Sequence, residues 1–589
     1  MNTTSWKDRK IIQLLFWIGV VWFFYGFTLF FDFFVFDDGL HIWDNAITGV
    51  RTPNDLFYYW RFSLTPVIYF VWQLVSIVFS NQDPAPFRAL NFVLMGGCSF
   101  LVFDLSRTYL KLISKGYHAF EYFLPFLAGL FFLLHPSQVE SIVWVSSGRT
   151  LLATFFALLS LKSLSLVEEE SDFSKYTFLT VVFFVLGVLS KPSIVTLPVL
   201  MAGLLYLKGK NIKQALSVLW PIILIGIVMG FLHISEVFTP YLKTLSYADR
   251  LIIVLDSISS YFKILYFPFI QSFDYARNPA NVLSEWYANK WLFLISPSLI
   301  LISIFSGLFT KRFKTWSLFM LGFYALLLPN MGFIYYDFQN ISTVSSRYLH
   351  LPLVIVSFAI IPLGLFLIDK WKNYSIALAC STLGVFILMA LINFNYARLW
   401  VNSLEVLSHS RSITGPTYPL SMSMGNLYMR SGKYKLAEKE FLEAWDLEPI
   451  DYGPVLALIE LYQIYKFKGP IDNFLTKVRE RGVFITPDKS FEIAKLYAEI
   501  DNYERARHFS NIAYKSNIEP EASKAFYLKS IEMLNRKKIN HYLFVIKNFI
   551  ELKKFKMAQD IYEVATLEFP NSRELLDLKN NLPSTNGEN

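Results

Sequence analysis

The sequence predicts an all-α protein in two parts, a polytopic membrane helix bundle followed by a soluble tetratricopeptide α-solenoid. Three observations predict this fold class. Of the 589 residues, 54% are hydrophobic and only 17% are charged, whereas soluble domains carry about 25% charged residues. Nearly all the long apolar runs precede residue 395. The Lys- and Glu-rich segment that follows repeats a helix-pair pattern.

The apolar runs predict about eleven membrane spans, because a helix needs about 20 apolar residues to cross a bilayer. The predicted spans are 11–31, 89–107, 120–135, 150–167, 176–190, 193–208, 214–232, 291–309, 315–333, 350–368 and 375–394.

The basic residues between these runs test the count, since cytoplasmic loops are enriched in Lys and Arg. With about eleven spans, six basic clusters fall on the cytoplasmic side. They are Lys7, Arg9 and Lys10; Arg107, Lys111 and Lys115; Lys162 and Lys175; Lys208, Lys210 and Lys213; Lys311, Arg312 and Lys314; and Lys370 and Lys372. The N-terminus is then cytoplasmic, and the soluble domain lies outside.

Two further apolar segments, 62–80 and 251–270, do not span in this topology and are expected to be interfacial or re-entrant helices on the outer side. The alternative topology makes both segments spans. It places Lys111, Lys115 and the cluster at Lys208–Lys213 on the outer side, against the charge rule.

The predicted domain boundaries follow from this topology. The membrane domain covers residues 1–398, with outer loops at 32–65, 135–147, 233–290 and 335–350. A linker at 399–416 leads to a tetratricopeptide domain at 417–575, and a disordered tail covers 576–589. The net charge of +8 comes largely from loop clusters and does not indicate nucleic-acid binding. Cys98 and Cys380 both lie in apolar runs, which excludes a disulfide framework.

Two units of the soluble part match the tetratricopeptide spacing of small and aromatic residues closed by a proline. A weaker copy covers 497–513, whereas residues 452–486 and 521–550 match poorly. The matching residues are Gly425, Tyr428, Ala437, Phe441, Ala444 and Pro449, then Phe555, Ala558, Tyr562, Ala565 and Pro570. A stack of such repeats presents a concave face that usually binds a peptide or protein. The sequence does not identify the binding residues on that face.

Ionisable residues gather in the predicted outer loops. The acids are Asp37, Asp38, Glu140 and Asp274; the cations are Arg149, Lys191, Arg277 and Arg347, which is followed by Tyr348. Carboxylates at a membrane face can act as a general base or bind a divalent metal such as Mg²⁺ or Mn²⁺. Outer-face cations suit a phosphate. Together they are what transfer from a lipid-phosphate donor requires.

Each of these features also has a purely structural interpretation. Asp37 and Asp38 could form a solvated loop with a turn at Gly39. Placing Glu140 in an apolar stretch costs free energy unless its carboxylate is paired, and Arg149 is a possible partner. Lys191 could extend its amine toward the interface along an apolar surface.

Six stretches, in chain order, resemble the transmembrane and tetratricopeptide-repeat O-mannosyltransferases and their bacterial relatives, within the polyprenol-phosphate-dependent (GT-C) glycosyltransferases. The stretches are Phe36-Asp37-Asp38 with Asp44-Asn45, Arg88-Ala89-Leu90-Asn91, the segment from His135 through Glu140 to Gly148-Arg149, Leu189-Ser190-Lys191-Pro192, Phe273-Asp274-Tyr275, and Gln339-Asn340 leading to Arg347-Tyr348-Leu349. The resemblance covers nearly the whole chain.

The resemblance implies a sugar, such as mannose, carried by a polyprenyl phosphate and transferred on the outer face of a bacterial inner (cytoplasmic) membrane. Asp37 and Asp38 would supply the base or position a metal. Glu140, Arg149, Lys191, Asp274, Arg277, Arg347 and Tyr348 would bind substrate and phosphate. The repeats would present a protein or peptide acceptor.

One departure from the family stands out, because Ser346 occupies a position where the family usually has Asp. This favours the alternative of a catalytically inactive membrane scaffold that binds partners through its repeats. A transporter is disfavoured, since its ionisable residues would lie at mid-membrane.

Overall fold

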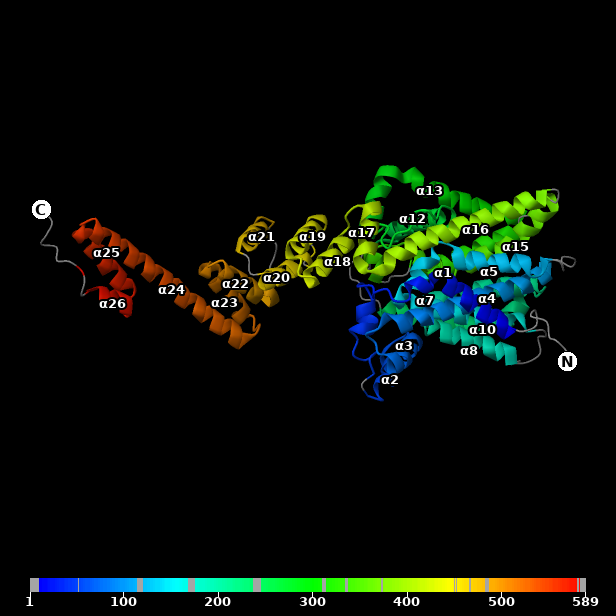
Figure 1. Cartoon of the computed structure of the whole chain (residues 1–589), viewed down its shortest axis with the longest axis horizontal. Coiled ribbons are helices and arrows are strands. Elements are labelled where there is room, and N and C mark those ends of the chain that lie inside the picture. The colour runs from blue at the N-terminus through cyan, green and yellow to red at the C-terminus, as the bar shows by residue number, and fades with distance from the viewer. Residues whose placement is uncertain are drawn as a thin grey trace. The chain divides into compact units, whose positions relative to one another are not determined.

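The computed structural model describes residues 10–50, 52–113, 120–167, 175–236, 245–309, 314–333, 337–371, 374–449, 451, 453–465, 468–481, 487–579 and 582. Over these residues it is all-helical, without strands. The chain divides into two compact units, unit 1 from Met1 to Ser423 and unit 2 from Met424 to Asn589 (Figure 1).

Several sequence predictions fall outside the described residues. They concern Lys7, Arg9, Lys115, Lys311, Arg312 and Lys372 of the basic clusters, loop residues 237–244 and 335–336, and tail residues 580–581 and 583–589.

Unit 1 is a bundle of α-helices joined by short 3₁₀ or π turns, which are labelled η. Its elements are α1 (Lys10–Tyr25), η2 (Gly26–Thr28), η3 (Gly39–Trp43), α2 (Asp55–Phe62), α3 (Pro66–Phe79), α4 (Pro84–Ile113), α5 (Phe123–Leu134), α6 (Gln138–Val143), η5 (Val145–Ser147), α7 (Gly148–Ser165), α8 (Lys175–Val188), η6 (Pro192–Thr196), α9 (Leu197–Leu207), α10 (Ile212–Glu236), α12 (Tyr247–Tyr266), α13 (Pro279–Phe309), α14 (Lys314–Leu327), η8 (Leu328–Asn330), η9 (Asp337–Asn340), η10 (Ser346–Leu349), α15 (Leu353–Lys370), α16 (Ser375–Ala397), η12 (Arg398–Val401) and α17 (Ser403–Thr414).

Among the described residues, five helical segments are long and apolar enough to cross a membrane. They are Lys10–Thr28, Pro84–Ile113, Ile212–His233, Leu353–Lys370 and Ser375–Val401. Shorter apolar helices include α3, α5, α8 and α9. Every one of the eleven predicted spans contains most of a helix or lies within one. The sequence therefore located the helices correctly, and the number that cross the membrane stays a prediction.

The two apolar segments excluded by the charge rule are helical but are not among these five. Segment 62–80 contains α3, whose 14 residues extend about 21 Å and fall short of a hydrocarbon core of about 30 Å. Segment 251–270 lies mostly in α12. That helix carries the buried Arg250, which donates to the carbonyl of Gly332 at 3.0 Å, and the buried Asp256.

Helix α4 lies at the centre of the bundle, and α1, α5 and α7 pack against it. Most of its residues are buried. Glycine permits the closest approach, because a Cβ atom on Gly96 would lie 2.7 Å from the Cα of Ile18. On α5, a Cβ on Gly129 would lie 2.7 Å from the Trp17 ring.

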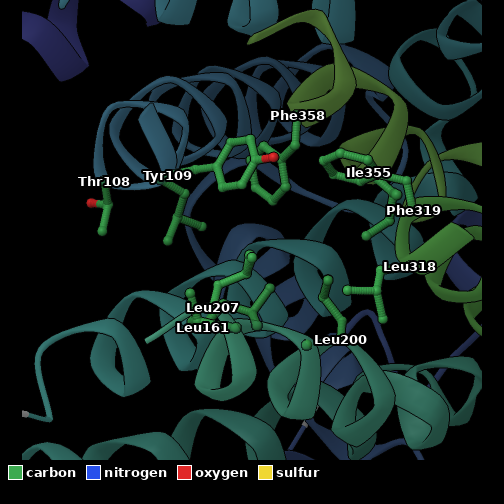
Figure 2. Close-up of a pocket in the computed structure, with 12 residues that line it drawn as sticks. Thr108, Tyr109, Leu161, Leu200, Leu207, Leu318, Phe319, Ile355 and Phe358 are labelled. Carbon is green, nitrogen blue, oxygen red and sulfur yellow. The ribbon is translucent and has the colours of Figure 1, made fainter. Parts of the chain in front are cut away.

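The bundle is not filled everywhere. A small apolar pocket of about 80 Å³ lies between α4, α7, α9, α14 and α15, with Tyr109, Leu200 and Phe358 among its lining residues (Figure 2). A larger apolar groove of about 950 Å³ lies between α9, α10 and α14. Because Leu200, Gly203 and Leu318 line both spaces, the pocket adjoins the groove.

A polar cluster joins the ends of α4, α5 and α7. Asp104 forms an ion pair with Lys162 at 2.7 Å. Glu121 pairs with Arg107 at 2.8 Å and with Lys111 at 2.9 Å. All the cations in this cluster belong to the basic groups that the charge rule assigns to the cytoplasmic side.

Unit 2 contains α18 (Tyr418–Arg430, which begins in unit 1), α19 (Tyr434–Leu447), α20 (Gly453–Tyr465), α21 (Lys468–Glu480), α22 (Pro487–Glu499), α23 (Tyr503–Lys515), α24 (Pro520–Glu551), α25 (Phe555–Glu568) and α26 (Arg573–Lys579). Successive helices pack on one another, most extensively α22 on α23 and α23 on α24. Gly425 allows α18 to meet α19, since a Cβ there would lie 2.4 Å from the ring of Phe441. The tetratricopeptide assignment stays a prediction.

Three segments of the C-terminal half are more regularly helical than the sequence-based expectation. The linker at 399–416 is largely helical, because Asn402 caps α17 by accepting from the backbone N–H of Glu405 at 3.0 Å. The poorly matching segment 521–550 is a single helix, α24, which contains no Gly or Pro after Pro520 to break it. Of the predicted tail, residues 576–579 belong to α26.

Candidate functional site

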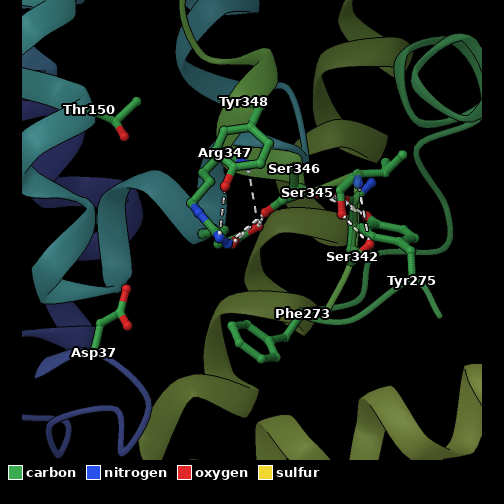
Figure 3. Close-up of polar contacts among 12 residues, drawn as sticks. Asp37, Thr150, Phe273, Tyr275, Ser342, Ser345, Ser346, Arg347 and Tyr348 are labelled. Atoms are coloured by element: carbon green, nitrogen blue, oxygen red, sulfur yellow. Dashed lines mark hydrogen bonds and ion pairs between the residues drawn. The ribbon is translucent and has the colours of Figure 1, made fainter. Parts of the chain in front are cut away.

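A polar cavity of about 470 Å³ lies in unit 1 where several of the predicted outer loops meet. Four of the predicted site residues with charged side chains line it: Asp37, Arg149, Lys191 and Arg347. Tyr348 lines it as well. In Figure 3, Asp37 and Thr150 face Arg347 and Tyr348 from the opposite side. The sequence therefore identified most of the charged groups of this cavity.

The two adjacent acids of the first loop have different environments. Asp37 faces the cavity and pairs with Arg149 at 3.7 Å. Asp38 is fully buried and lies outside the cavity lining. Its Oδ2 accepts from the backbone N–H of Phe34 at 2.8 Å, and its Oδ1 accepts from the backbone N–H and the hydroxyl of Ser146. Burial raises the pKa of Asp38 to about 6, against the lowering effect of these hydrogen bonds.

These contacts give the two acids separate roles. Asp37 is the carboxylate that a substrate in the cavity can reach, whereas Asp38 joins the first loop to the loop before α7. The Asp38 carboxylate stabilises the fold because it accepts hydrogen bonds from three buried donors. Without it, these donors would be left unpaired.

Glu140 and Arg347 form an ion pair in the wall of the cavity. The Glu140 side chain is fully buried, and the Arg347 side chain is 8% exposed. Arg347 donates through Nη1 to Oε1 of Glu140, and Ser345 donates to the same oxygen at 2.9 Å. The guanidinium also lies over aromatic rings, 4.0 Å from the centroid of Phe338 and 4.9 Å from that of Trp144.

Arg149, a possible partner of Glu140 from the sequence, is therefore not its partner in the structure. Arg149 lies at the start of α7 and pairs with Asp37 instead. Sequence proximity suggested the partner, but Arg347 is 207 positions away in the chain. Only the fold brings these two groups together.

Lys191 completes a group of three cations around the cavity. Its amine donates to the hydroxyl of Thr150 at 2.8 Å and lies 5.1 Å from the ring centroid of Tyr348. Burial, together with the nearby Arg347 and Arg149, lowers the pKa of Lys191 well below its ordinary value. A bound anion would offset this repulsion, because opposite charge favours the protonated amine.

Asp274 and Arg277 do not line the cavity. Asp274 is buried and accepts from the Thr417 hydroxyl at 2.6 Å and from the backbone N–H of Ala276 at 2.7 Å. Arg277 pairs with Asp256 at 2.5 Å and with Glu285 at 2.7 Å. Both residues hold loops in place, so the prediction that they contact phosphate gains no geometric support.

Ser346, which departs from the resembling family, is buried outside the cavity lining. Its hydroxyl donates to Oε1 of Gln271 at 2.8 Å and forms a second hydrogen bond with the hydroxyl of Tyr275 at 2.7 Å (Figure 3). Its polar contacts therefore run toward residues 271–275 rather than into the cavity.

The donor set does not fit the predicted divalent metal at Asp37 and Asp38. Both Asp38 oxygens already accept protein donors, and Asp37 is paired with Arg149. In the part of the chain that the structure describes, no group of three or more His, Cys, Asp or Glu side chains could hold a metal.

Residues that the sequence did not single out also line the cavity, among them His41, Thr65, Trp144, Thr150 and Phe338. For His41 a signal was available, since it lies four residues after Asp37 and would share its face in a helical turn. For Phe338 no signal existed, because its position over Arg347 depends on the fold.

Comparisons with protein-family models, with curated proteins and with solved structures found no match to this chain.

The different environments of Asp37 and Asp38 predict different effects on stability. Asp38→Ala leaves three buried donors without an acceptor and is expected to destabilise unit 1 by about 2 kcal/mol or more. Asp37→Ala removes one partly exposed ion pair, which is worth about 0–1 kcal/mol. Thermal unfolding of the full chain in detergent measures both. Equal losses of stability in the two variants would contradict the assignment.

Proposed function

We propose that the chain is a membrane glycosyltransferase that transfers a sugar from a polyprenyl-phosphate donor to a hydroxyl group of a protein acceptor on the outer face of the membrane. The observation that carries the proposal is one cavity that combines an accessible carboxylate with three cations and opens beside an apolar groove. The family resemblance suggests mannose as the sugar and a bacterial inner membrane as the location.

The groove supports a donor with a lipid tail. It is lined mainly by aliphatic side chains of α9, α10 and α14, and Val195 and Gly230 line both the groove and the polar cavity. A molecule with an anionic head and a long apolar chain would therefore place its head among the cations and its chain along these helices. Burial of apolar surface would then contribute to binding.

In the proposed reaction, Asp37 accepts the proton of the acceptor hydroxyl. The hydroxyl oxygen forms a bond to the anomeric carbon, and the bond between that carbon and the phosphate oxygen breaks. The polyprenyl phosphate leaves with the electron pair of that bond. Arg149, Lys191 and Arg347 hold the phosphate, and their charge stabilises it most as negative charge develops on the leaving oxygen.

The alternative is an inactive scaffold that binds partners through unit 2, which the departure at Ser346 favours. Ser346 lies outside the cavity lining, and the carboxylate and three cations of the cavity are all present. This arrangement favours an enzyme over the scaffold. The tetratricopeptide assignment adds the proposal that unit 2 presents or selects the protein acceptor.

Contacts within the site also support the proposed topology of about eleven spans. Asp37 pairs with Arg149, and Arg347 pairs with Glu140, so each pair must lie on one side of the membrane. With segment 62–80 as a span, three spans would separate Asp37 from Arg149. With segment 251–270 as a span, five spans would separate Lys191 from Arg347, yet both line the same cavity.

Transfer activity tests the role of Asp37. Asp37→Asn keeps the size of the side chain but removes the base, and is expected to lower transfer by at least about 100-fold. The measurement is the transfer of radiolabelled sugar from undecaprenyl-phosphate monosaccharides to extracytoplasmic proteins in membranes that contain the full chain. Activity in Asp37→Asn equal to that of the wild type would overturn the assignment of the base. Absence of transfer by the wild type with every donor would favour the scaffold.

The groove is tested by filling it. A Cβ on Gly203 would meet no atom within 4 Å, so Gly203→Leu adds bulk to the groove without a clash at its base. It is expected to weaken binding of undecaprenyl phosphate by about tenfold or more. Gly384→Leu is the matched control, because Gly384 has the same open surroundings but does not line the groove. Equal binding in the two variants would count against the groove.

The topology predicts the side of the membrane on which the C-terminus and the loop between Lys162 and Lys175 lie. A reporter active only outside the cytoplasm, fused after residue 589, is expected to be active, because the span count puts unit 2 on the outer side. The same reporter placed in the loop between Lys162 and Lys175 is expected to be inactive. The reverse pattern would refute the topology and, with it, the proposed role of unit 2.

A further inference from the structure

We propose that His41 contacts the sugar of the donor and contributes to the choice of sugar, an inference that rests on the proposed function. His41 lines the same cavity as Asp37. The two residues lie one turn apart, and the backbone N–H of His41 donates to the carbonyl of Asp37 at 3.0 Å. A group beside the base is close to the anomeric carbon, where the acceptor hydroxyl must attack.

The imidazole is held by a network of aromatic and polar groups. Its Nδ1 lies 2.7 Å from the Tyr69 hydroxyl. Tyr69 stacks on Tyr59 with ring centroids 3.9 Å apart, and Tyr59 donates to Oδ1 of Asn45 at 3.0 Å. The carbonyl of His41 accepts from the Thr48 hydroxyl at 2.8 Å. These contacts fix both the backbone and the ring before any substrate binds.

With Nδ1 occupied, Nε2 is the ring atom that remains for a ligand, and no described residue forms a hydrogen bond with it. Burial and the neighbouring Arg149 lower the pKa of His41 to about 2, so the ring is neutral. A neutral imidazole donates at one nitrogen and accepts at the other. A sugar hydroxyl can serve as donor or acceptor and therefore matches Nε2 in either tautomer.

Charge places the phosphate elsewhere in the cavity. Lys191 and Arg347, which come from other loops, attract the phosphate. Beside His41, the carboxylate of Asp37 offsets the charge of its partner Arg149 at 3.7 Å, so this side of the cavity attracts the phosphate less. The side of the cavity next to Asp37 and His41 is thus left to the neutral part of the donor. A single fixed group at that position can discriminate between sugars, because an unmatched polar group in a confined site weakens binding.

The test compares two lipids in the full-length chain reconstituted in nanodiscs. One probe is undecaprenyl phosphate, and the other is the undecaprenyl-phosphate monosaccharide that the wild type binds best. The measured quantity is the affinity for the monosaccharide lipid divided by the affinity for undecaprenyl phosphate. Both affinities are measured in one preparation, so the ratio does not depend on the fraction of folded protein. His41→Phe is expected to reduce this ratio by about tenfold and leave binding of undecaprenyl phosphate unchanged.

Two further variants separate sugar contact from a structural role. His41→Gln keeps a side chain able to donate and accept, and is expected to retain most of the ratio. Tyr69→Phe leaves the imidazole in place without its hydrogen bond, and is expected to give an intermediate ratio. A purely structural His41 would instead weaken both lipids together.

The possible results have distinct meanings. An unchanged ratio in His41→Phe, or an equal loss for both lipids, overturns the role of His41 and leaves the proposed function in place. If the wild type binds neither lipid, the proposed function fails, and the inference fails with it.

Discussion

The buried ion pair between Glu140 and Arg347 is the interaction on which the arrangement of unit 1 depends. A carboxylate that is fully buried in an apolar bundle is costly without a partner. Arg347 supplies that partner, and Ser345 adds a hydrogen bond at 2.9 Å. The pair joins α6 to the loop before α15 and holds one wall of the cavity. Loss of either partner would leave a buried charge uncompensated, so the two residues are expected to act as a unit.

This pair also constrains how a phosphate could be bound. Arg347 already shares its charge with Glu140, and its guanidinium lies over Phe338 at 4.0 Å. It is therefore held in a fixed position before a ligand arrives, which reduces the entropy lost on binding. Lys191 has no carboxylate partner among the ion pairs that the structure describes, and burial, together with the nearby Arg347 and Arg149, lowers its pKa. An anion would contribute most at Lys191, with Arg347 acting as a rigid second contact.

The sequence predicted more of the cavity than of its surroundings. Apolar run length located the helices, since run length is a local property of the chain. Loop charge grouped Asp37, Arg149, Lys191 and Arg347 on one side, and these four meet. The sequence pattern could not show that the Asp38 side chain lies outside the cavity. Asp37 and Asp38 are adjacent and identical in type, and only the fold determines which of the two side chains faces the cavity. Nor could the pattern show that Arg277 pairs with Asp256, since that pairing depends on how α12 packs beside the loop.

The predicted linker at 399–416 is largely helical, and its helix α17 contacts loops of the site. Residues 399–416 are expected to connect two domains. Helix α17, which lies in this range, also forms hydrogen bonds with two loops of unit 1. At its start, Ser403 accepts from the backbone N–H of Val35 at 2.9 Å, just before Asp37. Further along, Ser410 accepts from the backbone N–H of Phe273 at 3.1 Å.

The loop that begins at Gln271 extends this contact toward Arg347. Gln271 accepts from Ser346, the residue before Arg347, and its carbonyl lies 3.1 Å from Nε2 of His409 on α17. The segment that leads to unit 2 therefore braces the acidic loop and the cationic loop together. Helix α17 thus contacts the chain just before Asp37 directly, and it reaches the residue before Arg347 through Gln271. A domain boundary at residue 398 would separate α17 from the two loops of unit 1 to which it is hydrogen-bonded.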